Sequence, residues 1–172
     1  LAADALAWDT PARPGRGRAI CISASDAGSE PVTTSLLRVH ADGSVTVTVG
    51  STEIGQGSST VLAQIAAAEM DLPLDRVRLL HSDTTAASYD RSTGASRTTT
   101  LVGLAIQSAA RDAKSQLLEW ARDAIAGGGA VEPAKGGVLV AGVHHEWGAI
   151  VRAWFAGAGG EGARAGLAPG VT

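Results

Sequence analysis

Cysteine is almost missing from this sequence, since Cys21 is the only one among 172 residues. A single thiol excludes an internal disulfide and a metal site built from several cysteines, and it favours a reducing compartment such as the cytoplasm. The simplest interpretation makes Cys21 a residue of the hydrophobic core. Apolar runs stop well short of the ~20 residues needed to cross a bilayer, and no signal-peptide pattern opens the sequence. We therefore expect no membrane partner.

Positive charge is not in excess, because the formal net charge is -3 and lysine and arginine form no local cluster. This balance gives no electrostatic reason to expect a nucleic-acid partner. Two polar loops, at 51–60 and 90–100, match neither a Walker A motif nor GxGxxG, so an ordinary nucleotide site is not indicated there. The run His144, His145 and Glu146 lacks the spacing of an HExxH zinc site. A polar turn before a helix is the expected structure there.

The composition, 45% hydrophobic and 18% charged, is typical of a globular domain. Residues 1–18 include "DTPARPGRGR", which has nothing periodic to bury, and they are predicted to be a linker or arm. Residues 127–172 are predicted to hold a short strand and a helix, followed by a glycine-rich truncated linker. Residues 19–126 are left as the main domain of what reads as a fragment.

Hydrophobic periodicity predicts a mixed α/β chain. Val45, Val47 and Val49 alternate with threonines, which is typical of a half-buried strand. In order, the predicted elements are a hairpin over 33–49, a helix over 61–70, a strand over 76–82, a helix over 98–126, a strand over 136–143 and a short helix over 147–155. The expected fold is a small twisted sheet packed with two main helices and one short helix, in the α+β sense.

A small polar loop, "STEIGQGSST" at 51–60, lies directly before the first predicted helix. Gly55 and Gly57 permit positive φ and let a ligand approach the backbone closely. Gln56 both donates and accepts hydrogen bonds, and Ser58 offers a hydroxyl. The N-terminus of a helix also attracts anions, so the loop is a candidate ligand site.

The same loop also has a plainer interpretation, in which Ser58 or Ser59 merely caps the helix and the glycines merely make the turn. Glu53 is expected to stabilise the loop or to be a surface carboxylate, rather than a catalytic base. His81 and Asp83 end a predicted strand, and such a histidine is usually satisfied by backbone groups.

A second loop, "DRSTGASRTTT" at 90–100, repeats the same composition before the second long helix. If the two helices pack side by side, their N-termini converge on one extended anion such as a pyrophosphate, with Ser96 and the Ala95 amide contributing. Arg97 is either a phosphate ligand or a solvated charge at the helix start, and the second is commoner.

These loops and their surroundings resemble one known family. The stretch "DGSVTVTVGSTEIGQGSSTVLAQIAAAEMDLPLDRVRL", followed by "SDTTAASYDRSTGASRTTT", is similar to the molybdopterin-binding subunits of the molybdenum hydroxylases, such as xanthine dehydrogenase and aldehyde oxidase. The resemblance implies that residues 19–126 are part of the cofactor-binding domain of the large subunit. It also implies that the pyranopterin, often a cytosine dinucleotide, is held by Gly55, Gln56, Gly57, Ser58, Gly94, Ala95 and Ser96.

The resemblance further implies hydroxylation of an aldehyde or aromatic heterocycle with water as the oxygen source. Electrons would leave through iron–sulfur and FAD groups on partner subunits or domains, and the rest of the large subunit would be a further partner. The metal would hang from the pterin dithiolene, so no protein metal ligand is expected. No catalytic residue is assigned, because Glu161 follows the first loop too soon for the family's general base. The isolated chain is expected to be inactive.

Two other classes of function stay open from the sequence. A stand-alone phosphate- or nucleotide-binding module would bind cytidine nucleotides without metal. A structural or interaction module would bind neither, and Trp147, Trp154 and Phe155, which otherwise read as core residues, would form its contact surface.

Overall fold

The structure is a computed structural model that describes residues 2–24, 32–81, 85, 87, 89–91 and 93–157. The elements, in chain order, are α1 Ala2–Ala5, β1 Ser35–Val39, β2 Val45–Val49, α2 Ser58–Glu69, the 3-10 turn η1 Leu74–Arg76, β3 Val77–His81, the π-helical turn η2 Thr98–Val102, α3 Gly103–Ala124, β4 Glu132–Ala134, β5 Gly137–Val140, β6 Val143–Glu146 and α4 Trp147–Gly157. The predicted mixed α+β class is confirmed. No helix in the described part of the chain is long and apolar enough to cross a membrane.

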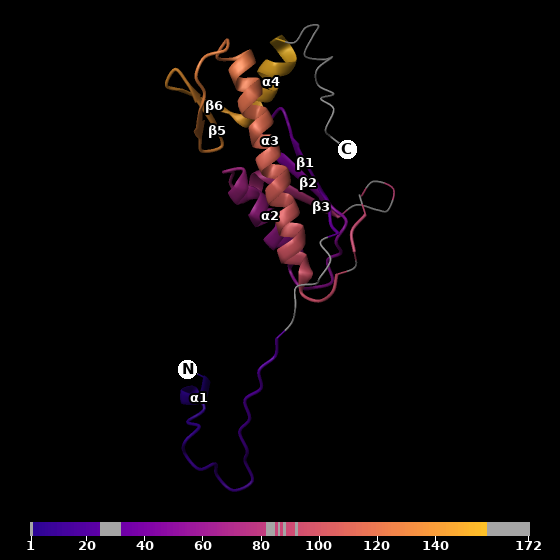
Figure 1. Cartoon of the computed structure of the whole chain (residues 1–172), viewed down its shortest axis with the longest axis vertical. Coiled ribbons are helices and arrows are strands. Elements are labelled where there is room, and N and C mark those ends of the chain that lie inside the picture. Colours follow the sequence, from indigo (N-terminus) through magenta and orange to yellow (C-terminus); the bar gives the residue numbers. More distant parts are fainter. Residues whose placement is uncertain are drawn as a thin grey trace.

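The first sheet has the order β1-β2-β3, with β1 antiparallel and β3 parallel to β2. The predicted alternation is confirmed, because Val45, Val47 and Val49 are buried while Thr46 and Thr48 are only half-buried. Helix α2 forms the crossover that a parallel pair requires. The long helix α3 runs alongside both α2 and the sheet (Figure 1).

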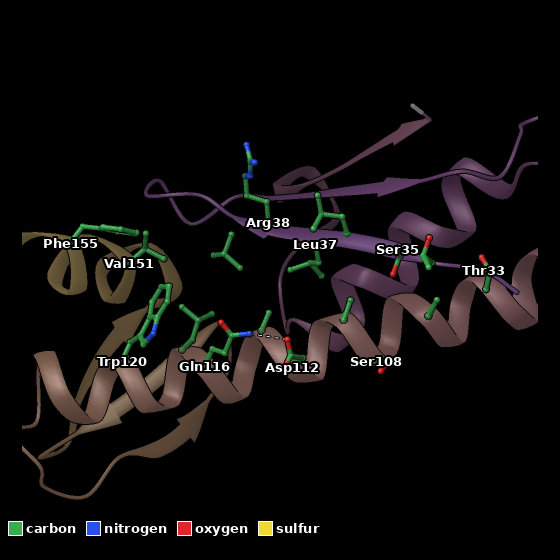
Figure 2. Close-up of a pocket in the computed structure, with 17 residues that line it drawn as sticks. Thr33, Ser35, Leu37, Arg38, Ser108, Asp112, Gln116, Trp120, Val151 and Phe155 are labelled. Atoms are coloured by element: carbon green, nitrogen blue, oxygen red, sulfur yellow. Dashed lines mark hydrogen bonds between the residues drawn. The ribbon is translucent and has the colours of Figure 1, made fainter. Parts of the chain in front are cut away.

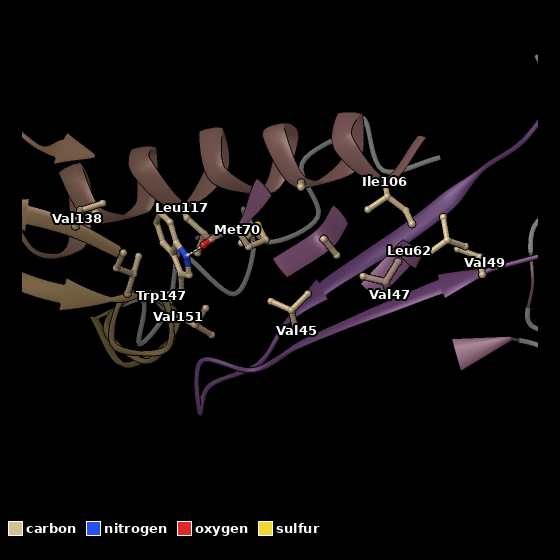
Figure 3. Packing of buried hydrophobic residues seen from close by; sticks show 14 of the residues in the cluster. Val45, Val47, Val49, Leu62, Met70, Ile106, Leu117, Val138, Trp147 and Val151 are labelled. Carbon is tan, nitrogen blue, oxygen red and sulfur yellow. Dashed lines mark hydrogen bonds between the residues drawn. The ribbon is translucent and has the colours of Figure 1, made fainter. Parts of the chain in front are cut away.

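The hydrophobic core lies between this sheet and the helices (Figure 3). Gly103 allows α3 to approach α2 closely, since a Cβ there would come within 2.9 Å of the Ile65 side chain. At the other end of the core, Trp147 of α4 is 1% exposed and its indole Nε1 donates a 2.9 Å hydrogen bond to the Met70 carbonyl. Trp147 is therefore a core residue, as the helical spacing indicated.

The expectation of one sheet is wrong, because β4, β5 and β6 form a second antiparallel sheet. The predicted polar turn at His144, His145 and Glu146 is also wrong, since these residues belong to β6. The tight turn at Ala141 and Gly142, both with positive φ, reverses the chain and pairs the two strands. The His144 Nε2–H donates a 3.0 Å hydrogen bond to the Lys135 carbonyl.

Residues 2–24 extend away from the body of the protein (Figure 1). Within this arm, the Arg18 guanidinium hydrogen-bonds the carbonyls of Ala7, Thr10 and Pro11. Cys21 is exposed, so its assignment to the core is wrong. The reason is that the arm is not paired with a strand of either sheet in this arrangement.

Candidate functional site

The carboxylate of Glu53 organises the loop that precedes α2. It accepts hydrogen bonds from the amides of Gly55 (2.8 Å), Gly57 (3.0 Å) and Ser59 (2.9 Å). The hydroxyls of Ser58 and Ser59 donate to the same carboxylate, at 3.0 and 3.1 Å. These bonds, led by the one from the Ser59 amide, lower the pKa of Glu53 to about 2. The prediction that Glu53 stabilises the loop is confirmed.

This arrangement changes the expected chemistry of the α2 N-terminus. Gly57, not a serine, is the N-cap residue. Its φ is 78°, and glycine has no side chain that could cap the helix. The amides that would attract a phosphate bind the Glu53 carboxylate instead, which supplies the negative charge that the helix dipole favours. The expectation that this helix end attracts an external anion stays a prediction, and the three amides that bind Glu53 are already occupied.

Gln56 is exposed, but its amide group is folded back on the loop. Its Oε1 accepts from the Ile54 amide at 2.7 Å, and its Nε2 donates to the Thr52 carbonyl at 3.1 Å and to the Ser58 hydroxyl at 3.0 Å. The two Nε2 protons are therefore used within the loop, while Oε1 keeps a second lone pair that could accept from a ligand. Gln56 thus shapes the loop in addition to being available at its surface.

His81 joins the end of β3 to the same loop. Its Nδ1 lies 2.6 Å from the Ser51 carbonyl, which confirms the prediction that a backbone group satisfies this histidine. Its Nε2 lies 2.8 Å from the Ser59 hydroxyl, so His81, Ser59 and Glu53 form one hydrogen-bonded chain. Asp83 and Glu161 lie outside the described residues.

The second loop lies beside the first. The Thr93 hydroxyl donates a 3.2 Å hydrogen bond to the Thr52 carbonyl, which ties the two segments together. Gly94, Ala95 and Ser96 are all exposed. Ala95 and Ser96 have φ of 49° and 54°, in the left-handed region that residues with a Cβ seldom adopt. A strained backbone followed by a π-helical turn is typical of functional sites.

Arg97 is neither solvated nor exposed to a phosphate, so both expectations for it are wrong. Its side chain is 6% exposed and forms an ion pair with Asp90, whose side chain is 1% exposed, at 3.7 Å between Nη1 and Oδ1. Its Nη2 donates a 2.9 Å hydrogen bond to the Val32 carbonyl, just before β1. These contacts tie the residue that follows the strained Ala95 and Ser96 backbone to the segment before β1. The sequence did not predict that Asp90 is the buried partner of Arg97, because two opposite charges seven residues apart do not indicate that either side chain is buried.

The two loops that hold the predicted site residues are therefore joined by the Thr93–Thr52 bond, and all of these residues are exposed except Ser58, which is buried at the start of α2. Their surfaces offer backbone groups, an amide and hydroxyls, which suit a polar organic ligand. No cluster of three histidine, cysteine, aspartate or glutamate side chains is placed to hold a bare metal ion among the described residues. A metal carried by its own organic ligand fits this donor set.

We expect Glu53→Gln to lower the stability of the chain at neutral pH and to flatten its dependence on acidity. Because the folded pKa of Glu53, about 2, lies below its ordinary value of 4.5, its contribution is complete above pH ~4.5 and disappears as the pH falls toward ~2. Urea unfolding of both proteins across that window measures the effect. Glu119→Gln, at an exposed carboxylate on α3, controls for net charge. Identical pH profiles for Glu53→Gln and the parent would contradict the assignment.

Comparison with known proteins gives relatives for this arrangement. The chain is 39% identical over 75 residues to the carbon monoxide dehydrogenase large chain of Hydrogenophaga pseudoflava, a match that covers 44% of this chain and 9% of that protein. It is 35% identical over 83 residues to the xanthine dehydrogenase molybdenum-binding subunit of Escherichia coli O157:H7, covering 48% and 11%. The chain thus spans about a tenth of the length of these relatives.

The fold is also similar to a solved structure, the reconstituted CO dehydrogenase from Oligotropha carboxidovorans. The TM-score is 0.63 at 28% identity, and the match covers 71% of this chain and 16% of that one. A family model described as the molybdopterin cofactor-binding domain matches residues 3–167. That match includes both loops, both sheets and every helix, except that the first residue of α1, Ala2, lies before it. The chain therefore belongs to the molybdopterin cofactor-binding domain family.

Proposed function

We propose that the two loops hold a molybdopterin cofactor against their exposed surfaces, as molybdopterin itself or as its cytosine dinucleotide. The observation that carries the proposal is the Thr93 to Thr52 hydrogen bond, because it sets the two family motifs side by side. The residues proposed to form the cofactor site are Gly55, Gln56, Gly57, Ser58, Gly94, Ala95 and Ser96.

The described geometry supports different roles for these residues. Around Gly55 and Gly57, no atom would lie within 4 Å of an added Cβ, so the backbone is open to close approach. Ser96 presents an exposed hydroxyl as a donor, while Ser58 is 2% exposed and acts through Glu53 and Gln56. Glu53 and the Asp90–Arg97 pair hold the two loops in shape.

In this proposal the chain is part of the larger subunit of a molybdenum hydroxylase that works in the cytoplasm. The bound cofactor supplies the oxidation chemistry at its metal, in a reaction that hydroxylates an aldehyde or aromatic heterocycle with oxygen from water. Iron–sulfur and flavin partners would take the electrons. Because this chain contributes cofactor contacts and no assigned general base, it would be inactive when isolated.

Replacing Gly57 tests the proposal within the full-length subunit. Gly57→Val should abolish cofactor retention per folded molecule, because valine is strained at φ of 78° and covers the approach to the loop. Ser96→Ala removes one donor, worth about 1.5–3 kcal/mol if it faces a charged group, and should weaken binding by about tenfold to a hundredfold. Molybdenum and pterin content are measured against the folded fraction from circular dichroism.

Gly142 provides a matched control, since it has φ of 79°, open space around it and a position in the β5–β6 turn. Gly142→Val should strain the chain to a similar degree and leave cofactor retention unchanged. Normal retention in both Gly57→Val and Ser96→Ala would refute the proposed site. Binding of cytidine nucleotides without metal would instead support a stand-alone nucleotide module, and binding of neither would support a structural role.

A further inference from the structure

A groove of about 800 Å³ runs between β1 and α3 (Figure 2). One wall is the whole of β1 with the residues just before it, and the other is one face of α3. Val151 and Phe155 of α4 close one end. Half of the α3 residues that line the groove are small, namely Ala105, Ser108, Ala109 and Ala113, and the others are Asp112, Gln116, Leu117 and Trp120.

The strand wall is a sheet edge that has no partner strand among the described residues. The His40 amide donates to the Ser44 carbonyl at 2.8 Å, and the register continues this pairing to Arg38 with Thr46 and to Leu36 with Thr48. In an antiparallel ladder the residues between such pairs direct their N–H and C=O groups to the other side. The backbone groups of Ser35, Leu37 and Val39 therefore face the groove, where no described strand pairs with them. The Thr33 and Ser35 hydroxyls are buried and have no hydrogen-bond partner among the described residues.

The arm carries a segment with the pattern that this groove requires. In residues 18–23, "RAICIS", two isoleucines alternate with small residues, which is typical of a strand with one apolar face. Ile22 is 96% exposed and Ile20 is 43% exposed, so the structure leaves this apolar face without cover. The segment is joined to β1 through residues 24–34, which gives it a high effective concentration at the groove.

We propose that residues 18–23 dock in the groove of their own chain as a fourth strand, antiparallel to β1. Ile20 and Ile22 then face the small residues of α3, and the added backbone pairs with the free edge at Ser35, Leu37 and Val39. Exposed, unpaired edges are sites where proteins add a strand, because the main-chain groups are already aligned. The docked arm places Cys21 on the opposite face of the sheet, beside Leu36 and Arg38.

Disulfide trapping in the full 172-residue chain tests this position, since Cys21 is its only cysteine. Leu36→Cys and Arg38→Cys each place a thiol on the outer face of β1, and each reports one register of the arm. Leu80→Cys is the control. Leu36 pairs with Thr48, and Thr48 pairs with Leu80, so Leu80 lies on the same face of the sheet but on β3, at the opposite edge. Mild oxidation followed by mass spectrometry of linked peptides measures the product.

The expected result is a disulfide from Cys21 to position 36 or 38 within one chain, formed at least tenfold faster than the disulfide to position 80. Adding Ile20→Asp and Ile22→Asp should slow that reaction severalfold, because the apolar face is lost. Equal rates at all three positions would overturn the proposal. Disulfides found mainly between two chains at low concentration would also overturn it, because the occupant would then be the arm of a second copy.

Discussion

Arg97→Met should lower the free energy of unfolding by about 3–5 kcal/mol, the usual result of removing one partner of a buried ion pair. The remaining Asp90 carboxylate would be left in a nearly closed environment, since its side chain is 1% exposed. The same change releases the strained Ala95 and Ser96 backbone from its attachment at the Val32 carbonyl. Cofactor retention should therefore fall in the molecules that still fold.

A second variant separates these two effects. Asp90→Leu with Arg97→Met removes both charges, and it should recover much of the lost stability because no unpaired charge stays buried. Cofactor retention should not recover, because the loop is still without its anchor. Arg111→Met is the control, since the Arg111 side chain is 69% exposed in its 3.5 Å ion pair with Glu69 and such pairs are worth at most about 1 kcal/mol. Full retention in the double variant would show that the pair does not position the loop.

Trp147→Ala should be the other most damaging substitution, at about 3–5 kcal/mol of unfolding free energy. The side chain is 1% exposed and lies where α4 meets the core cluster and the end of α2 (Figure 3). Trp147→Phe keeps most of the buried ring and loses the bond to the Met70 carbonyl, and it should cost about 1–3 kcal/mol.

Urea unfolding measures both variants, with Phe155→Ala as the control on the same helix. Phe155 is 58% exposed, so its truncation should cost about 0.5 kcal/mol or less. Its ring and that of Trp154 meet Trp120 of α3, with the two indoles stacked at 5.1 Å between centroids. If Trp147→Ala and Phe155→Ala were equally mild, Trp147 would not be the residue that fixes α4 to the core.

Much of the first sheet follows from the sequence because its signals are local. Val45, Val47 and Val49 alternate with polar residues, and a strand with one buried face needs only that period. The helix stripe from 61 to 70 and the stop at Pro73 are equally local. The second sheet was not recognised as separate, because β4, β5 and β6 have three or four residues each and such short runs carry little periodic signal.

The sequence by itself determined the mixed fold class and membership of the molybdopterin cofactor-binding family. It also determined the two polar loops, one before α2 and one before the turn that leads into α3. Only the tertiary structure decided which charges are buried and what they do. Glu53 takes the helix amides that an external anion was expected to bind, and Arg97 turns inward to Asp90. The physical reason is that the role of a charge depends on its distance from other groups and from water, and a sequence lists residue types without those distances.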